Sequence, residues 1–232
     1  VKNTLSLDYS TKLDDVKLDP DDDLEHFTFS KNRSFRFSNR TAITFQNPVI
    51  KSLNMSFAYS GGYQETYSQR YLNGAPKGIS DKDTSDEIYE GYFIPGNYLS
   101  FEHIIGRPNN MNGNISLSNE VFTGKLRHNI SVGGSLYYSE NVGQGVVVDP
   151  TKPRWANSAY QNDRPYSFEA LPDILNYGIY LQDNTKFDVF NRELSVNAGL
   201  RYDVQNGQGT LQPRINMAYK LKRNIDFTLA YG

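Results

Sequence analysis

Apolar and polar residues alternate one by one along much of this chain. The clearest run covers residues 193–203, in which Leu194, Val196, Ala198, Leu200 and Tyr202 alternate with polar residues and glycine. Successive side chains of a β-strand point to opposite sides, so this period of two predicts a strand with one apolar and one polar face. About nine such runs follow one another, around residues 5–9, 35–46, 53–60, 115–121, 129–138, 177–181, 193–203, 212–221 and 225–231.

The connections between these runs alternate in length. Short links fall at residues 47–51, 123–127, 189–192 and 222–224. Long or irregular links fall at 11–27, 69–111 and 143–173, and a briefer one at 205–210. Outer-membrane barrels have short periplasmic turns at one end and long extracellular loops at the other. We therefore predict an all-β fold, a transmembrane antiparallel β-barrel to which this chain contributes about nine strands.

The composition of the two faces favours a membrane barrel over a soluble β-sandwich. The polar face is rich in Ser, Asn, Gly, Thr and Gln, with scattered Arg and Asp, which suits a hydrated lumen. A soluble sandwich would carry many Lys and Glu on its outer face. The apolar face often ends in an aromatic residue, as in the girdles that lie at lipid headgroups. These aromatic residues are Tyr9, Phe45, Tyr59, Tyr138, Tyr202, Tyr219 and Tyr231.

Composition argues against several other classes of protein. The 232 residues carry a net charge of −2 and no cysteine, so the chain has neither a disulfide framework nor a thiolate metal site. No stretch approaches the ~18 consecutive apolar residues of a membrane helix. The three histidines stand far apart in sequence, and the acidic runs at 19–23 and 81–87 do not match a calcium-binding loop. We expect no metal, no cofactor and no enzymatic activity.

The last third of the chain carries an ordered series of short motifs. In chain order the motif residues are Tyr177, Tyr180, Gln182, Asp183, Gly199, Arg201, Tyr202, Asp203, Pro213, Arg214, Tyr219, Tyr231 and Gly232. This series resembles the barrel of TonB-dependent outer-membrane receptors, whose strands commonly read Y-x-x-Y-x-Q-D, G-x-R-Y-D, P-R-x-x-x-x-Y and Y-G. His128 fills the place of a family histidine that precedes an apolar strand.

The resemblance implies an N-terminal plug and a barrel of about 22 strands. Residues 1–232 are then expected to be an internal part of one β-barrel domain, with the plug and the barrel-closing strands outside them. The implied location is the outer membrane of a Gram-negative bacterium, and the Asn- and Tyr-rich strands suggest a Bacteroidetes-type receptor. The expected partners are outer-membrane lipid, the receptor's own plug, TonB acting through the plug, and a surface lipoprotein lid. No nucleic acid is expected.

The link at residues 143–173 holds the candidate ligand-binding residues. It contains the single tryptophan of the chain, together with nearby arginines and tyrosines: Trp155, Arg154, Tyr160, Arg164 and Tyr166. Aromatic rings beside arginine can stack on a sugar, a haem or a chelate, and aromatic anchors often dominate binding. The same residues could equally pack the loop on its neighbours, and the sequence leaves both interpretations open.

Six charged residues fall on the predicted polar face. They are Arg36, Arg40, Arg201, Asp203, Arg214 and Asp226. We expect them to form a lumen-facing network of ion pairs that stiffens the wall, and contact with plug or substrate is the alternative. Tyr202 and Asp203 stand at a strand end, where they are expected to anchor a loop.

These observations favour a transporter, the barrel portion of an energy-dependent receptor for a scarce ligand such as a siderophore, haem, vitamin, peptide or glycan. Two alternatives from other classes remain at this point. One is a small complete outer-membrane barrel with a structural or adhesive role, which requires an even strand count. The other is a soluble β-sandwich binding module, which requires a lysine-rich outer face.

Overall fold

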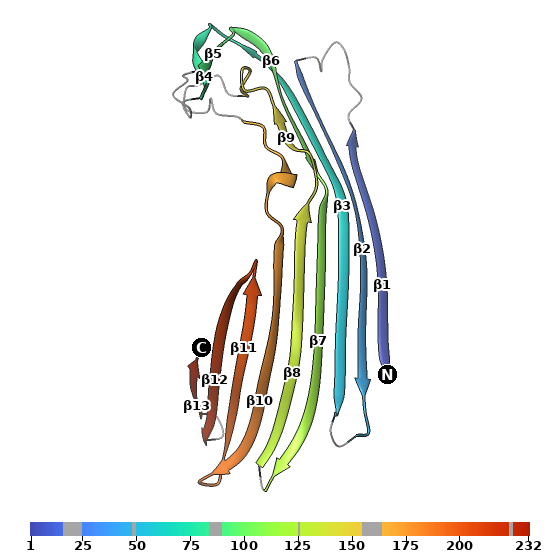
Figure 1. The fold of residues 1–232 in the computed structure, drawn as a ribbon, viewed down its shortest axis with the longest axis vertical. Coiled ribbons are helices and arrows are strands. Elements are labelled where there is room, and N and C mark those ends of the chain that lie inside the picture. The colour runs from blue at the N-terminus through green and yellow to red at the C-terminus, as the bar shows by residue number, and fades with distance from the viewer. Residues whose placement is uncertain (16–24, 48–49, 84–89, 125, 155–163, 223–224) are drawn as a thin grey trace.

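A computed structural model describes residues 1–15, 25–47, 50–83, 90–124, 126–154, 164–222 and 225–232. Nearly all of them lie in β-strands (Figure 1). The elements in chain order are β1 (Lys2–Asp15), β2 (His26–Thr44), β3 (Ser52–Asn73), β4 (Lys77–Asp83), β5 (Glu90–Ile94), β6 (Asn97–Gly106), β7 (Pro108–Thr123), β8 (Leu126–Asn141), β9 (Gly145–Val148), the 3-10 turn η2 (Phe168–Ala170), β10 (Ile174–Val189), β11 (Arg192–Gln205), β12 (Gln208–Lys222) and β13 (Ile225–Tyr231).

One antiparallel sheet contains all of the long strands. Its main path has the order β1-β2-β3-β7-β8-β10-β11-β12-β13, in which each strand pairs with the next along the path. β6 extends the sheet by pairing with the last part of β3, and β9 pairs with β6. β4 and β5 form a separate two-stranded sheet. The nine strands of this path coincide with the nine alternating runs of the sequence, so the predicted strand order is confirmed.

The links divide between the two ends of the sheet as the sequence indicates. In Figure 1, the links β2–β3, β7–β8, β10–β11 and β12–β13 lie at the lower end, and the links after β1, β3 and β8 lie at the upper end. We call these the short-turn end and the long-loop end. The long-loop end also carries the β4–β5 hairpin and β9 (Figure 1).

Two predicted links are wrong in their details. The link at 205–210 is a two-residue turn, with φ of 47° at Asn206 and 86° at Gly207. An Asn-Gly pair adopts this left-handed conformation readily, which allows β11 and β12 to join directly. The link at 69–111 is mostly strand, because β3 continues to Asn73 and pairs with β6 from Gln64↔Gly106 to Asn73↔Asn97.

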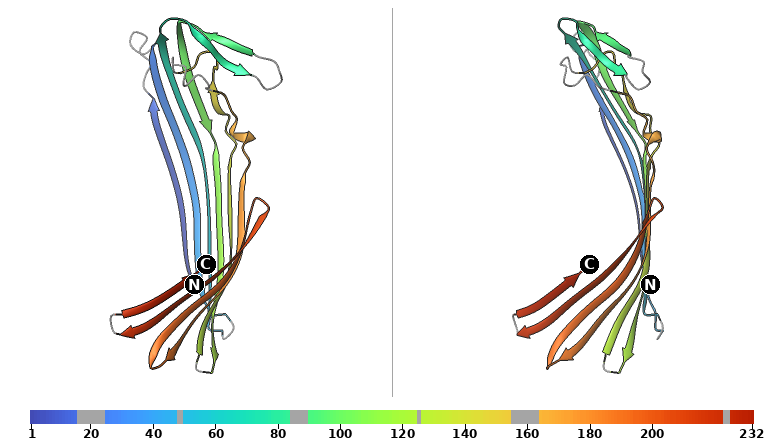
Figure 2. Two further views of the ribbon diagram at one scale, coloured as in Figure 1. Left: turned by 90° about the vertical axis from the view of Figure 1, so that its left-hand side faces the viewer. Right: turned by 60° about the vertical axis from the view of Figure 1, so that its left-hand side comes forward.

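The sheet is a single curled layer with two chemically different faces (Figure 2). Residues paired across antiparallel strands share a face. One such row runs from Phe37 through Tyr59 and Met111 to Tyr138, and we call its side the apolar face. The opposite side, which carries Arg36 and its cross-strand partner Ser60, is the polar face.

Most large apolar side chains of the described residues remain exposed. The buried hydrophobic ones are Ile94, Tyr98, Val148 and Val204, whereas Leu7, Ile179 and Leu181 on the apolar face are 75%, 66% and 53% exposed. A β-sandwich would cover such a face with a second sheet, and Figure 2 shows a single layer, so the sandwich interpretation is wrong. β1 and β13 are the edges of the sheet, which is not closed within this chain. No helix among the described residues is long and apolar enough to cross a membrane.

Candidate functional site

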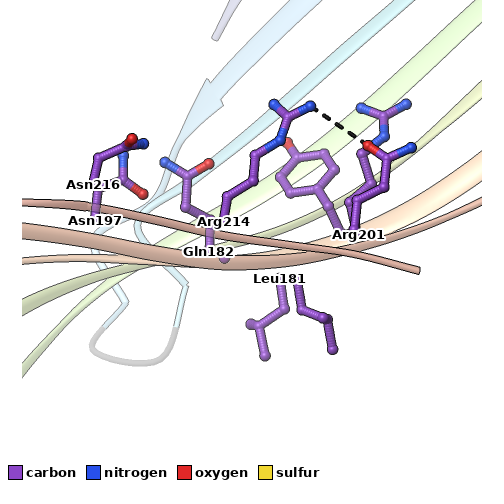
Figure 3. A pocket seen from close by; sticks show the side chains of 10 residues that line it. Leu181, Gln182, Asn197, Arg201, Arg214 and Asn216 are labelled. Atoms are coloured by element: carbon purple, nitrogen blue, oxygen red, sulfur yellow. Dashed lines mark hydrogen bonds between the residues drawn. The ribbon is translucent and has the colours of Figure 1, made fainter. Parts of the chain in front are cut away.

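The polar face is hollowed at three places. A hollow of about 330 Å³ lies over β10, β11 and β12 (Figure 3). Its polar lining consists of Tyr180, Gln182, Asn197, Arg201, Gln212, Arg214 and Asn216. Figure 3 shows the labelled polar side chains on one side of these strands and Leu181 on the other. Strict alternation therefore separates a wet wall from an apolar surface within a single layer of strands.

Arg201 and Asp203 form the best-defined contact of this wall. The Nε of Arg201 lies 2.6 Å from Oδ2 of Asp203, and its Nη2 donates to Oγ of Ser135 at 3.2 Å. The two residues are two positions apart on β11, so they point to the same face. Asp203 lies over Gly178 of β10, where an added Cβ would collide with the carboxylate. The pair thus ties β11 to β8 and β10.

The other predicted wall residues also lie on the polar face, in separate places. Arg36 and Arg40 line a second hollow, of about 370 Å³, over β2, β3 and β7. Arg214 donates to Oε1 of Gln212 at 3.5 Å within the first hollow. Asp226 is in register with Lys220 near the short-turn end. The six predicted residues therefore occupy three regions of the wall, and the structure brings Arg201 and Asp203 together.

At the long-loop end, a short segment after β9 holds Arg154 against the sheet. Nη1 of Arg154 lies 2.6 Å from Oε1 of Glu102 on β6. The hydroxyl of the buried Tyr98 donates to the carbonyl oxygen of Pro153 at 2.8 Å. Arg154, predicted from sequence to bind ligand, is thus fixed at a defined point on the rim of the sheet.

Asp149 shapes the turn that leads to Arg154. Its Oδ1 accepts from the backbone N of Thr151 at 3.0 Å and from the Thr151 hydroxyl at 2.6 Å. Oδ2 lies 3.5 Å from Nζ of Lys152. Burial alone would raise the pKa of Asp149, but these hydrogen bonds and the lysine outweigh it and hold the pKa below its usual range. The carboxylate is therefore ionised when the turn is formed.

The remaining loop candidates are described in part. Tyr166 pairs with Val146 of β9 through two backbone hydrogen bonds of 2.9 and 3.1 Å, and its half-exposed ring contacts Phe168 edge-on at 5.7 Å. Arg164 lies two residues before it. Trp155 and Tyr160 lie outside the described residues. Arg154 and Tyr166 therefore flank β9, each attached to the strand system by its own contacts.

Comparison with known proteins identifies the origin of this wall. The family described as TonB dependent receptor-like, beta-barrel matches residues 2–232. The chain belongs to this family. Its members are receptors and transporters of the Gram-negative outer membrane, and they are not enzymes. No curated protein and no solved structure gives a significant match.

Membership of the TonB-dependent receptor family explains the two faces of the sheet. The apolar face is the surface that such a barrel presents to lipid, and the polar face lines its interior. Long loops of these barrels are extracellular, so the long-loop end, with Arg154 and Tyr166, is the outer end. Family members in general carry a plug domain and interact with TonB.

Two residues of the family motifs meet on the apolar face, near the short-turn end. Nδ1 of His128 on β8 lies 2.7 Å from Oδ2 of Asp183 on β10. The hydroxyl of Thr185 completes the cluster, 2.8 Å from His128 Nδ1 and 2.9 Å from Asp183 Oδ2. Sequence analysis identified both motif positions but not their contact, because the register between β8 and β10 was unknown.

Sequence analysis also missed a polar hollow at the outer end. Ser68, Arg70, Ser100 and Arg154 line it, and we call it the rim hollow. The first three residues fell within or near the supposed link at 69–111. The signal was nevertheless present, because polar residues continue at every second position from Ser60 through Gln64 to Arg70.

Proposed function

We propose that this chain is the wall of an active-transport receptor that takes up a scarce ligand with energy delivered by TonB. The observation that supports it is the family match over residues 2–232. The polar hollows add to this, because a receptor wall must face both the plug and the incoming ligand through water. In this proposal the whole chain belongs to one barrel domain, and the plug lies outside residues 1–232.

Each group of wall residues has a role in this proposal. Arg201, Asp203 and Ser135 stiffen the wall through charge-assisted hydrogen bonds. The basic residues Arg36, Arg40 and Arg214 face the interior, where the plug would contact them. Asp226, beside Lys220, belongs to the same face near the short turns.

The outer end receives the ligand in this proposal. Residues of the segment 154–166, including Trp155, Tyr160 and Arg164, would contact it by stacking and by charge. A surface lipoprotein would close the outer end as a lid, as in Bacteroidetes-type receptors. The lipid-facing surface makes outer-membrane lipid the other constant partner.

The test is uptake in matched strains. The receptor gene is deleted and complemented in its host, with TonB present or absent. Accumulation of labelled ferric siderophores, haem, cobalamin, peptides and glycans is then measured. We expect one ligand class to accumulate when receptor and TonB are both present, and to bind the cell surface without entering when TonB is absent. Accumulation that depends on the receptor but not on TonB would contradict the proposal.

A further inference from the structure

The rim hollow is a small cavity with an unusual lining. It has a volume of about 70 Å³ and lies between β3, β6 and the segment that follows β9. Arg70 pairs with Ser100 across β3 and β6, and Ser68 pairs with Glu102, so these side chains share one face. That face is the polar one, because no register shift separates Arg70 from Ser60 along β3. The hollow therefore opens toward the barrel interior at the outer end.

Ser100 carries a polar atom whose partner is missing from the described residues. Its side chain is 1% exposed, and its Oγ is fully buried without a hydrogen-bond partner among them. A buried hydroxyl left without a partner costs about 1–3 kcal/mol. Native proteins rarely keep such a group unless water or a ligand completes it. Because Ser100 lines the hollow, the completing atom would lie inside it.

The charge of the lining indicates which atom that is. Arg70 and Arg154 bring two positive charges to the hollow, and Glu102 offsets one of them through its 2.6 Å contact with Arg154. The lining is thus left with a net positive charge. A serine hydroxyl can donate one hydrogen bond, and guanidinium groups present N–H donors in a planar fork. The group that accepts from all three side chains is an anionic oxygen of a carboxylate or phosphate.

Arg154 is held in place before any ligand arrives. Glu102 fixes one guanidinium nitrogen, Tyr98 holds the carbonyl of Pro153, and Asp149 shapes the preceding turn. A pre-formed donor loses little freedom on binding, so its hydrogen bonds contribute more to affinity. By contrast, Tyr166 and Phe168 stack on the far side of β9, where they would contact the apolar part of a ligand.

We propose that the rim hollow binds an oxyanion group, a carboxylate or a phosphate, of the ligand that enters at the outer end. This inference rests on the proposed receptor function and narrows its substrate class. It selects acid-bearing ligands over neutral glycans. Ser100 and Arg70 act from the wall, and Arg154 acts from the loop, so the anion joins the loop to the sheet.

The test uses the full-length receptor in detergent, titrated with inorganic phosphate and with acetate and followed by calorimetry and NMR line width. We expect saturable binding of one or both anions. Arg70→Gln and Arg154→Gln should each weaken it at least tenfold, because each removes charged hydrogen bonds. Ser100→Ala, which keeps the charge, should weaken it several-fold.

Arg33→Gln is the matched control. Arg33 also lies on a strand of this part of the sheet, but it pairs with Tyr63 on the apolar face. Removing its charge should leave anion binding unchanged. Each variant is first shown to be folded by its heat-modifiable mobility in electrophoresis. No saturable binding in the unmodified receptor, or equal binding in folded Arg70→Gln, would overturn the inference.

The two proposals fail separately. Anion binding is measured on purified receptor without TonB, so it can persist if TonB-dependent uptake is disproved. If uptake is TonB-dependent but the hollow binds neither anion, the receptor function stands and the substrate class falls. The relative affinity for phosphate and acetate also decides which acid the hollow prefers.

Discussion

A charge placed on the apolar face should destabilise the protein far more than the same charge one residue away. Leu181 stands halfway along β10, between Val132 of β8 and Leu200 of β11. Gln182 is its neighbour in the chain and lines the largest polar-face hollow of β10–β12 (Figure 3). Leu181→Arg and Gln182→Arg therefore introduce one side chain at one height on two opposite faces.

The size of the difference follows from two contributions. Leu181 is 53% exposed in the isolated chain, so about half of its side chain would meet lipid. Losing that contact costs about 1 kcal/mol, from roughly 1.5–3 kcal/mol for a fully buried leucine. An arginine on the lipid side at mid-membrane adds about 2–4 kcal/mol. The sum of about 3–5 kcal/mol lowers the folded-to-unfolded ratio by roughly two to four orders of magnitude.

The measurement is the folding equilibrium of the full-length receptor in phosphatidylcholine vesicles, followed by guanidinium titration and by heat-modifiable electrophoretic mobility. Gln182→Arg should change the free energy of unfolding by about 1 kcal/mol or less, because its side chain enters a hydrated interior. Leu181→Ala separates the loss of contact from the cost of charge. If the two arginine variants were equally stable, or their order were reversed, the assignment of the faces to lipid and lumen would be refuted.

Three further predictions concern turns and contacts of the full-length receptor. Gly207→Ala should cost about 1–2 kcal/mol in the same titration, because φ is 86° there, while Gly74→Ala, with open space and no positive φ, should be neutral. Asp203→Asn should cost about 0.5–1 kcal/mol by weakening the partly exposed pair with Arg201, and the loss should shrink at high salt. Because the pKa of Asp149 is lowered in the folded turn, its contribution is present at neutral pH and lost as the pH falls below about 4; hydrogen-exchange protection of residues 150–154 should drop there, and Asp149→Asn should remove this pH dependence.

The strand pattern was predictable because a membrane barrel writes it into every strand. Each residue meets either lipid or water, with no buried core between them, so alternation survives along whole strands such as residues 193–203. The placement of long and short links at opposite ends followed from the antiparallel order. The same rule underlies the family match over residues 2–232.

Strand ends were harder to predict, for a physical reason. Beyond the membrane both faces of a strand meet water, and the apolar-polar contrast disappears. β3 continues in this way to Asn73 with Tyr67 and Gln69 on one face and Ser68 and Arg70 on the other. Cross-strand contacts between distant segments, such as His128 with Asp183, depend on register, which local pattern does not contain.

The family motifs describe the wall more than they describe the ligand. Asp203 lies over Gly178, the ring of Tyr180 lies over Gly133, and the ring of Tyr202 lies over Gly209, each across a strand boundary. In every case a large side chain occupies the space that a glycine leaves open, a device that lets a sheet curl without exposing backbone.

Motif residues used in this way have little freedom to adapt to different ligands. Specificity must then depend on residues outside the motifs. The rim hollow meets this condition, since Ser100 lies within the link that sequence analysis expected to be irregular and Arg154 lies in a loop without a family motif. A receptor family can thus keep one wall and change its ligand at the outer end, and the ligand chemistry of this chain should be sought where its motifs stop.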